Sequence, residues 1–278
     1  IILGRLVLKA SDRRGFLFNE MGFFTGLLGR LRGPTTSLRS FGKSYKLVAR
    51  APVARNTHRF TFALDSPDAV LGLPVGHHIE VRLPGGSGTS RAYTPVTGND
   101  TRGSFDLVVK IYKNGQLSTY LDSLQVGDSA EIAGPQGEIT YQGDGHFEIE
   151  DPFSESKRVV PCKSIGMIAG GTGITPMLQI CAHSASLPRD PLEMSLVFAS
   201  RTPADVMLRE ELDALAASCP RLRVAYSVDD VPAGSADDWL PADARGPVAE
   251  PLLRRALDAL PGRPELVCIC GPPGFHRV

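Results

Sequence analysis

The sequence predicts a two-domain protein in which an antiparallel β-barrel is followed by an α/β domain with a doubly wound parallel sheet. Between residues 44 and 133, short and often alternating runs of apolar and polar residues follow one another closely, with turn residues between them, which is typical of a barrel. After Ser164 the pattern changes to a regular alternation of strand and helix, which is typical of a parallel sheet with helices on both faces. At 278 residues, the chain is long enough for two cores of ordinary size.

The first domain is expected to consist of short strands, over residues 45–49, 57–64, 78–83, 105–112 and 128–133. The polar segment from about residue 143 to residue 157 contains Asp151-Pro152 and is expected to be a loop or an interdomain linker. We therefore place this domain at residues 44–155.

The second domain is expected at residues 156–278, with a truncated carboxyl-terminal end. Its predicted strands are 165–169, 192–199, 222–228 and 265–270, and its predicted helices are 176–185, 204–217 and 252–260. Because ligands of such sheets bind at the carboxyl ends of the strands, two segments become candidates for a site. These are Ile168 to Pro176 and Cys270-Gly271-Pro272-Pro273.

The first 43 residues differ from the rest of the chain. Five apolar residues recur there at helical spacing, with arginines on both sides: Leu17, Met21, Phe24, Leu28 and Leu31, flanked by Arg13, Arg14, Arg30 and Arg32. This segment could be a linker helix packed on the body, a helix that contacts a membrane surface through residues 13–33, or a disordered segment.

Composition excludes several classes of protein. Thirty basic and thirty acidic residues give a formal net charge of zero, which argues against nucleic acid as a partner. The five cysteines contain no Cys-x-x-Cys pair, so neither a disulfide framework nor a metal site is predicted, and a reducing compartment is favoured. No apolar run approaches the roughly 20 residues of a membrane-spanning helix. Because the chain begins at Ile1, it could be a fragment with an anchor or signal missing.

The segment from Ile168 to Pro176 is a strand that runs into three glycines and continues as a helix. Gly170, Gly171 and Gly173 permit positive φ and close approach of a ligand, and Thr175 and Pro176 are expected to cap and to start the helix. Free amides and the helix dipole would attract a pyrophosphate. The third glycine of the usual dinucleotide fingerprint is absent, so a tight structural turn stays open as an alternative.

A second candidate site is Arg91-Ala92-Tyr93-Thr94-Pro95. The arginine offers a fork that pairs with phosphate, the tyrosine a flat face, and the threonine a hydroxyl group. These groups would suit a flavin nucleotide. The same pattern is also compatible with a plain edge strand.

The order of these motifs closely resembles the NADH-cytochrome b5 reductase family. The motifs are Arg91 to Pro95, Asp106 to Tyr112, Gly115 to Leu121, Gly127-Asp128, Gly134-Pro135-x-Gly137, Ile168 to Pro176 and Cys270 to Pro273, and they cover about residues 44–275. The resemblance implies an FAD-binding antiparallel barrel, a nicotinamide-nucleotide domain, and electron transfer from NADH through FAD to cytochrome b5 or a similar haem protein.

The resemblance also implies the residues that bind FAD. Arg91 would bind the pyrophosphate, Tyr93 would pack beside the flavin and ribityl chain, and Thr94 would form a hydrogen bond near flavin N5. Lys110 and Tyr112 would line the same pocket. Gly115 and Ser118 match the phosphate loop of the family, in which Gln116 and Leu117 here replace the usual lysine and methionine.

On the nicotinamide side, the resemblance places Thr175 close to the flavin. Gly171, Thr172 and Gly173 would cradle NADH together with Gly271 and Pro272. Cys270 would lie beside the nicotinamide and help to aim it, so that Thr94 and Cys270 are the expected catalytic residues; a buried strand cysteine is the alternative for Cys270. Asp229 matches an acidic position that meets the adenosine ribose and favours NADH over NADPH, whereas Arg201 could partner the extra phosphate of NADPH.

Two features depart from the family pattern. The chain ends at Val278, before the usual carboxyl-terminal aromatic residue, and residues 1–43 do not match the family core. We expect an enzyme on the cytoplasmic side of an intracellular membrane (endoplasmic reticulum or mitochondrial outer membrane) or in the cytosol. The alternatives are the reductase module of a larger fused electron-transfer enzyme, or a non-catalytic nucleotide-binding or membrane-interaction protein.

Overall fold

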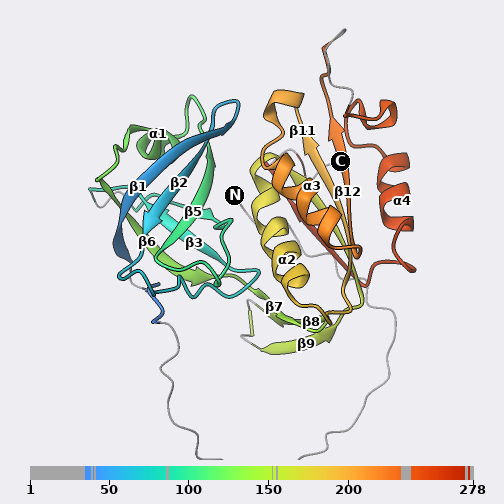
Figure 1. Ribbon diagram of the computed structural model, residues 1–278, viewed down its shortest axis with the longest axis horizontal. Helices are drawn as coiled ribbons and strands as arrows, with labels where there is room; N and C mark the ends of the chain where they lie inside the picture. The colour runs from blue at the N-terminus through green and yellow to red at the C-terminus, as the bar shows by residue number, and fades with distance from the viewer. Residues whose placement is uncertain are drawn as a thin grey trace, which may run out of the picture.

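The computed structural model describes residues 35–38, 40, 42–85, 88–151, 153–154, 156–232, 239–272 and 275. The helix expected near residues 13–33 lies outside these residues. Two domains stand side by side, with a small third sheet beneath them (Figure 1).

The first domain is a six-stranded antiparallel sheet that wraps around a common core (Figure 1). Its strands are β1 (Lys43–Ala54), β2 (Thr57–Ala63), β3 (His78–Arg82), β4 (Ser90–Tyr93), β5 (Ser104–Lys110) and β6 (Ser129–Gln136), in the order β4-β3-β6-β1-β2-β5. Alternate residues such as Phe60 and Phe62 of β2 point inward and are fully buried. The five expected strands are confirmed, and the arginine-tyrosine motif forms β4 at the edge of the sheet.

A short helix, α1 (Gln116–Ser123), follows β5 and was not among the expected elements. Leu117 and Leu121 of this helix are buried in the core of the first domain. The helix therefore attaches the segment after Tyr112 firmly to the barrel.

The segment expected to be a loop or linker contains one complete strand and one end residue of each of two others, so that expectation is wrong for residues 146–150. An antiparallel three-stranded sheet is formed by β7 (Ile139–Gly143), β8 (His146–Glu150) and β9 (Lys157–Pro161). Phe147 and Ile149 alternate with polar residues along β8 and are buried. Their side chains join the core of the parallel-sheet domain, which explains why so polar a sequence forms a strand.

The second domain has a four-stranded parallel sheet in the order β12-β11-β10-β13. The strands are β10 (Ser164–Gly170), β11 (Glu193–Ser200), β12 (Leu222–Val228) and β13 (Leu266–Cys270), as the sequence predicts to within a few residues. Helices α2 (Ile174–Ser186) and α3 (Arg209–Ser218) cover one face, and α4 (Glu250–Asp258) covers the other (Figure 1). Short 3₁₀ turns are η1 (Gly171–Gly173), η2 (Pro203–Asp205) and η3 (Ala242–Ala244).

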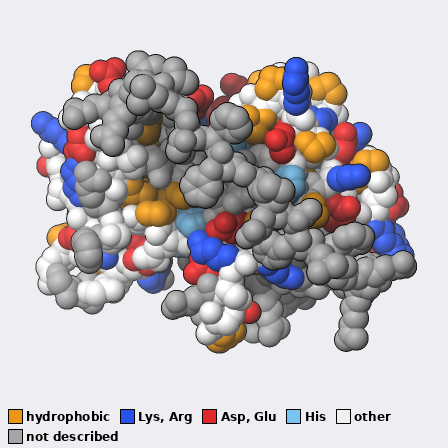
Figure 2. All heavy atoms as spheres, turned by 90° about the horizontal axis from the view of Figure 1, so that it is seen from below, with side chains coloured by type: hydrophobic (Ala, Val, Ile, Leu, Met, Phe, Trp, Pro, Cys, Tyr) orange, Lys and Arg blue, Asp and Glu red, His pale blue; other side chains and the backbone are white. Residues whose placement is uncertain are grey.

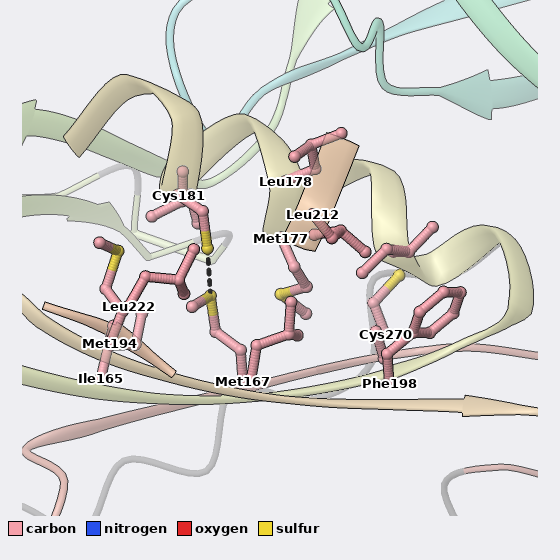
Figure 3. Close-up of a cluster of buried hydrophobic side chains, with 14 of the residues drawn as sticks. Ile165, Met167, Met177, Leu178, Cys181, Met194, Phe198, Leu212, Leu222 and Cys270 are labelled. Carbon is pink, nitrogen blue, oxygen red and sulfur yellow. Dashed lines mark hydrogen bonds between the residues drawn. The ribbon is translucent and has the colours of Figure 1, made fainter. Parts of the chain in front are cut away.

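The core of this domain lies between the sheet and helices α2 and α3. Met167 and Phe198 of the sheet face Met177 of α2 and Leu212 of α3, and Cys270 lies beside Phe198 at the end of this cluster (Figure 3). All five cysteines are free thiols. In the described part of the chain no helix is long and apolar enough to cross a bilayer.

The helix expected over residues 204–217 begins later than predicted. Residues Pro203–Asp205 form η2, and Leu208 takes a left-handed φ of 57°, so α3 starts only at Arg209. The carboxylate of Asp205 is used in contacts to the barrel instead of capping a helix. Glu210 and Glu211 in the first turn of α3 favour the observed start, because acidic side chains stabilise the positive end of a helix dipole.

Charged side chains of both signs are interspersed on the described part of the face shown in Figure 2. On β8 and β9, for example, Lys157 forms ion pairs with Glu148 at 3.0 Å and with Glu150 at 3.4 Å. This pattern agrees with the net charge of zero calculated from the sequence.

Candidate functional site

The candidate site lies where the carboxyl ends of β10 and β13 meet the edge of the barrel. Val108 of β5 is 3% exposed and packs into the core of the parallel-sheet domain. Val53, Val75 and Val96 of the first domain pack against the same core. The two domains thus share an apolar contact beside the predicted site residues.

A cleft of about 300 Å3 opens on the barrel side of this contact. Nine of its ten lining residues were predicted to bind FAD or NADH: Arg91, Tyr93, Lys110, Tyr112, Gly115, Gln116, Leu117, Ser118 and Thr172. The tenth is Asn114, which sequence reasoning missed because it lies between two of the motifs, in the turn before Gly115.

Two cations and two aromatic rings give this cleft its chemical character. The exposed guanidinium of Arg91 donates to the carbonyl of Ser90 at 2.7 Å, and Lys110 forms an ion pair with Asp205 of the other domain. Burial raises the pKa of Tyr93 to about 12, so its hydroxyl stays protonated at neutral pH. Tyr112 is 50% exposed. The cleft can therefore accept a ligand that is both anionic and aromatic.

The start of α1 forms one end of the cleft. Gly115 is its N-cap residue; no side chain caps this end, and the first turn holds no acidic residue, so the helix presents a positive dipole end to an anion. The Ser118 hydroxyl accepts from the Tyr112 amide at 3.2 Å and donates to the Gly115 carbonyl at 3.1 Å. Leu117 is 3% exposed, so most of its side chain serves the barrel core rather than the cleft.

A smaller hollow of about 20 Å3 lies between the domains. From the barrel it is lined by His78, Ala92, Tyr93, Thr94 and Val108, and from the parallel-sheet domain by Thr172, Thr175, Pro176 and Cys270. The structure therefore brings the two expected catalytic residues, Thr94 and Cys270, to one place. Ala92 and Val108 lie within the predicted motifs but were assigned no role, because apolar side chains carry no signal of a site.

Two polar side chains of this hollow are almost fully buried. Thr94 is 8% exposed and Thr175 is 6% exposed. The buried Nδ1 atom of His78 has no hydrogen-bond partner among the described residues, and burial lowers the pKa of this histidine. An unpaired buried nitrogen is costly, so it fits a place where a ligand supplies the missing partner.

The position of Cys270 is compatible with both interpretations that the sequence left open, a buried strand cysteine and a site residue. It is 1% exposed and belongs to the core of its domain, and it also lines the hollow. Burial raises the pKa of its thiol to about 11. The thiol is therefore neutral at physiological pH and is not poised as a thiolate nucleophile.

The glycine turn is held against the end of β13. A Cβ atom on Gly173 would lie 2.1 Å from the Cys270 carbonyl oxygen and 2.8 Å from the Gly271 nitrogen. Only glycine permits this approach, whereas Gly171 is required by its φ of 52°. Gly271 is buried beside this contact, and Pro272, the next residue, is exposed.

The expected roles of Thr175 and Pro176 in starting the helix are wrong. Helix α2 begins at Ile174 with Gly173 as its N-cap and without a side-chain cap. The 3₁₀ turn η1 leads directly into the helix, so Thr175 lies inside the first turn and donates to the Thr172 carbonyl at 3.2 Å.

Asp229 lies at the end of β12, outside both the cleft and the hollow. Burial raises the pKa of its carboxyl group, and the charge of Arg201 opposes that shift. Next to this pair is a further cleft of about 470 Å3, which is lined by Arg55, Thr202, Pro203, Ala204, Arg209, Pro232 and Trp239. The structure therefore places Asp229, which was expected to favour NADH, next to Arg201, which could favour NADPH.

Comparison with known proteins agrees with this architecture. Residues 44–141 match the oxidoreductase FAD-binding domain, and residues 167–278 match the oxidoreductase NAD-binding domain. NADH-cytochrome b5 reductase 1 of Homo sapiens is 41% identical over 283 residues, covering 96% of this chain and 90% of that protein. NADH-cytochrome b5 reductase 2 of Gallus gallus is 39% identical, covering 88% of this chain and 83% of that protein.

A solved structure gives the same result. The cytochrome b5 reductase domain of Ulva prolifera nitrate reductase superposes with a TM-score of 0.75 at 36% identity, covering 87% of this chain and 92% of that domain. The two domains and the site between them agree with these relatives. The chain belongs to the NADH-cytochrome b5 reductase family.

Proposed function

We propose that this chain transfers hydride from NADH to FAD and passes the electrons singly to cytochrome b5 or a similar haem protein. The observation that carries this proposal is the hollow between the domains, where Tyr93 and Thr94 lie opposite Thr172 and Cys270. Family membership supports the pair of cofactors, FAD and NADH.

The residues of the barrel cleft would hold FAD. Arg91 and the positive end of α1 would bind the diphosphate, and Tyr93 would pack against the flavin. The aromatic and cationic lining of the cleft fits such a group, and so does the unpaired His78 nitrogen at the adjoining hollow. FAD when bound supplies the change from a two-electron donor to a one-electron acceptor.

The glycine turn and the end of β13 would hold NADH. Residues 171–173 offer backbone amides at the uncapped start of α2, and Cys270 forms the buried wall of the hollow. The contact between Gly173 and the Cys270 carbonyl fixes these two segments relative to each other.

Neither Tyr93 nor Cys270 is suited to move a proton at neutral pH. Burial raises the pKa of the Tyr93 hydroxyl to about 12 and that of the Cys270 thiol to about 11, so both hold their protons. The side chains of the hollow therefore act by positioning the reactants and by excluding water.

Cytochrome b5 is proposed as acceptor because it is part of the names of the two relatives given above. We further propose that the basic and apolar segment at residues 13–33 contacts the cytoplasmic surface of an intracellular membrane. The helical spacing of its apolar residues and the arginines that flank them support this.

The test is to load the purified chain with FAD and to measure reduction of ferricyanide and of cytochrome b5 by NADH. We expect a yellow protein that reduces both acceptors. Reduction of ferricyanide alone would indicate a reductase whose protein acceptor is not cytochrome b5. Binding of FAD without reduction of either acceptor would favour a non-catalytic nucleotide-binding protein.

A second candidate is the reductase module of a larger enzyme. The likeness to the reductase domain of Ulva prolifera nitrate reductase favours it. The complete open reading frame distinguishes the two, because a haem or molybdenum domain on the same chain would support the module.

A further inference from the structure

Asp205 is a buried carboxylate that joins the two domains. It lies in η2 of the parallel-sheet domain and is 4% exposed. Its Oδ1 atom accepts from Lys110 Nζ at 2.9 Å, and its Oδ2 atom accepts from Arg55 Nη2 at 2.9 Å and from Thr202 Oγ1 at 2.7 Å. Lys110 and Arg55 both belong to the barrel, so one carboxylate holds two separate points of the other domain.

The surroundings keep this carboxylate charged. Burial alone would raise the pKa of Asp205, but hydrogen bonds from Lys110 and Thr202 and the charge of Lys110 outweigh it and lower the pKa to about 2. A backbone hydrogen bond from the Arg55 amide to the Ala204 carbonyl, at 2.9 Å, reinforces the same contact. The ion pairs therefore persist at neutral pH with their hydrogen-bonding groups satisfied.

The contact lies next to the candidate site. Lys110 lines the 300 Å3 cleft, and Arg55 and Thr202 line the 470 Å3 cleft. Lys110 is two residues after Val108 on β5, so both side chains are on the same face of the strand, and Val108 lines the hollow. Fixing Lys110 thus fixes the barrel wall of the hollow.

A second interdomain ion pair is less suited to holding the two domains in a fixed position. Arg59 pairs with Glu211 at 2.6 Å, but these side chains are 28% and 48% exposed, and Arg59 is shared with Asp106. Exposed pairs of this kind contribute little, because water screens them. The buried carboxylate is the better constraint on the position of the domains.

We propose that Asp205 is a positioning residue, which clamps the parallel-sheet domain to the barrel through Lys110 and Arg55 and so sets the alignment across the hollow. This inference rests on the proposed function. Its physical basis is that a displacement of about 1 Å between reacting groups can lower a rate by up to about 100-fold.

The principal variant is Asp205→Asn, which keeps the shape and removes the charge. With turnover expressed per bound flavin, we expect kcat with ferricyanide to fall by about 10-fold or more, and KM for NADH to change by less than about threefold, because alignment is realised in the transition state. A purely structural role would lower the yield of flavoprotein without changing turnover per flavin. Glu250→Gln is the matched control, since it removes the same charge from an ion pair with Arg254 that is about 70% exposed.

Arg55→Gln keeps the test open should Asp205→Asn fail to fold. The Arg55 side chain is 52% exposed, and its loss leaves the Lys110 contact, so we expect a smaller fall in kcat of about threefold. The double variant should be no slower than Asp205→Asn, because Arg55 acts through that carboxylate.

Hydrogen exchange of the protein without FAD provides a readout besides activity. We expect Asp205→Asn to accelerate amide exchange in residues 53–57, 107–111 and 202–206, on both sides of the interface, and Glu250→Gln to leave them unchanged. Parent-like turnover per flavin together with parent-like exchange would overturn the inference. An inactive parent protein would instead contradict the proposed function, and the exchange comparison would still test the clamp.

Discussion

Replacing Gly173 with alanine tests whether close contact between the glycine turn and β13 aligns the site. The backbone angles of Gly173, φ −65° and ψ −6°, suit alanine, so any effect comes from the added methyl group. That methyl carbon would lie 2.1 Å from the Cys270 oxygen and 2.4 Å from its carbonyl carbon, whereas ordinary contacts begin at 3.4 Å. The turn and the strand end must therefore separate by about 1 Å, since neither obstacle is a flexible side chain.

A separation of that size predicts two results. Overpacking should cost about 1–3 kcal/mol and lower Tm by several degrees. The displacement of Thr172 and Cys270 from the barrel side should lower kcat/KM for NADH by up to about 100-fold. FAD should stay bound, because nine of the ten residues lining the 300 Å3 cleft belong to the barrel domain.

Gly166→Ala is the control for Gly173→Ala. Its methyl group would meet the end of the Leu257 side chain at 2.6 Å, on the opposite face of the same sheet, and that side chain can move. We expect some loss of stability with nearly unchanged turnover, measured by thermal unfolding and by ferricyanide reduction. Gly173→Ala turning over NADH within a factor of two of the parent protein would refute the reasoning.

Three further predictions follow from single side chains. Arg91→Gln should release FAD during gel filtration, seen as lost visible absorbance, because it removes the exposed cation of the cleft; retention of the flavin would show that Arg91 is dispensable. Asp229→Ala should shift the ratio of kcat/KM values towards NADPH, since it removes the carboxylate and leaves Arg201, and an unchanged ratio would contradict that role. The depressed pKa of Asp205 predicts about 2 kcal/mol of stability that is complete above pH 4 and lost as the pH falls towards about 2. Urea unfolding across that range should show a weaker acid dependence for Asp205→Asn than for the parent.

The sequence was sufficient for the order of the domains and for most strands, because these follow from local alternation and from glycine turns. It was not sufficient where the reason for a structure lies far away in the chain. β8 is a strand because Phe147 and Ile149 are buried by the parallel-sheet domain, and α3 starts late because Asp205 is engaged by the barrel.

The same limit applies to the site. The motifs predicted nearly every residue of the 300 Å3 cleft, since each motif contributes neighbouring residues such as 115–118. Sequence reasoning did not find the contact of Gly173 with Cys270 or the ion pair of Lys110 with Asp205, because each joins segments about a hundred residues apart. Such contacts become visible only when the sheet order and the domain interface are known.

The most direct test of the central claim is rapid anaerobic mixing of the FAD-loaded chain with NADH, followed by the absorbance of the flavin. We expect that the flavin bleaches within the turnover time, that NADH carrying deuterium at the transferred position slows this step, and that added cytochrome b5 restores the oxidised spectrum. Flavin that stays oxidised in the presence of NADH would contradict hydride transfer at the hollow that Thr94 and Cys270 line.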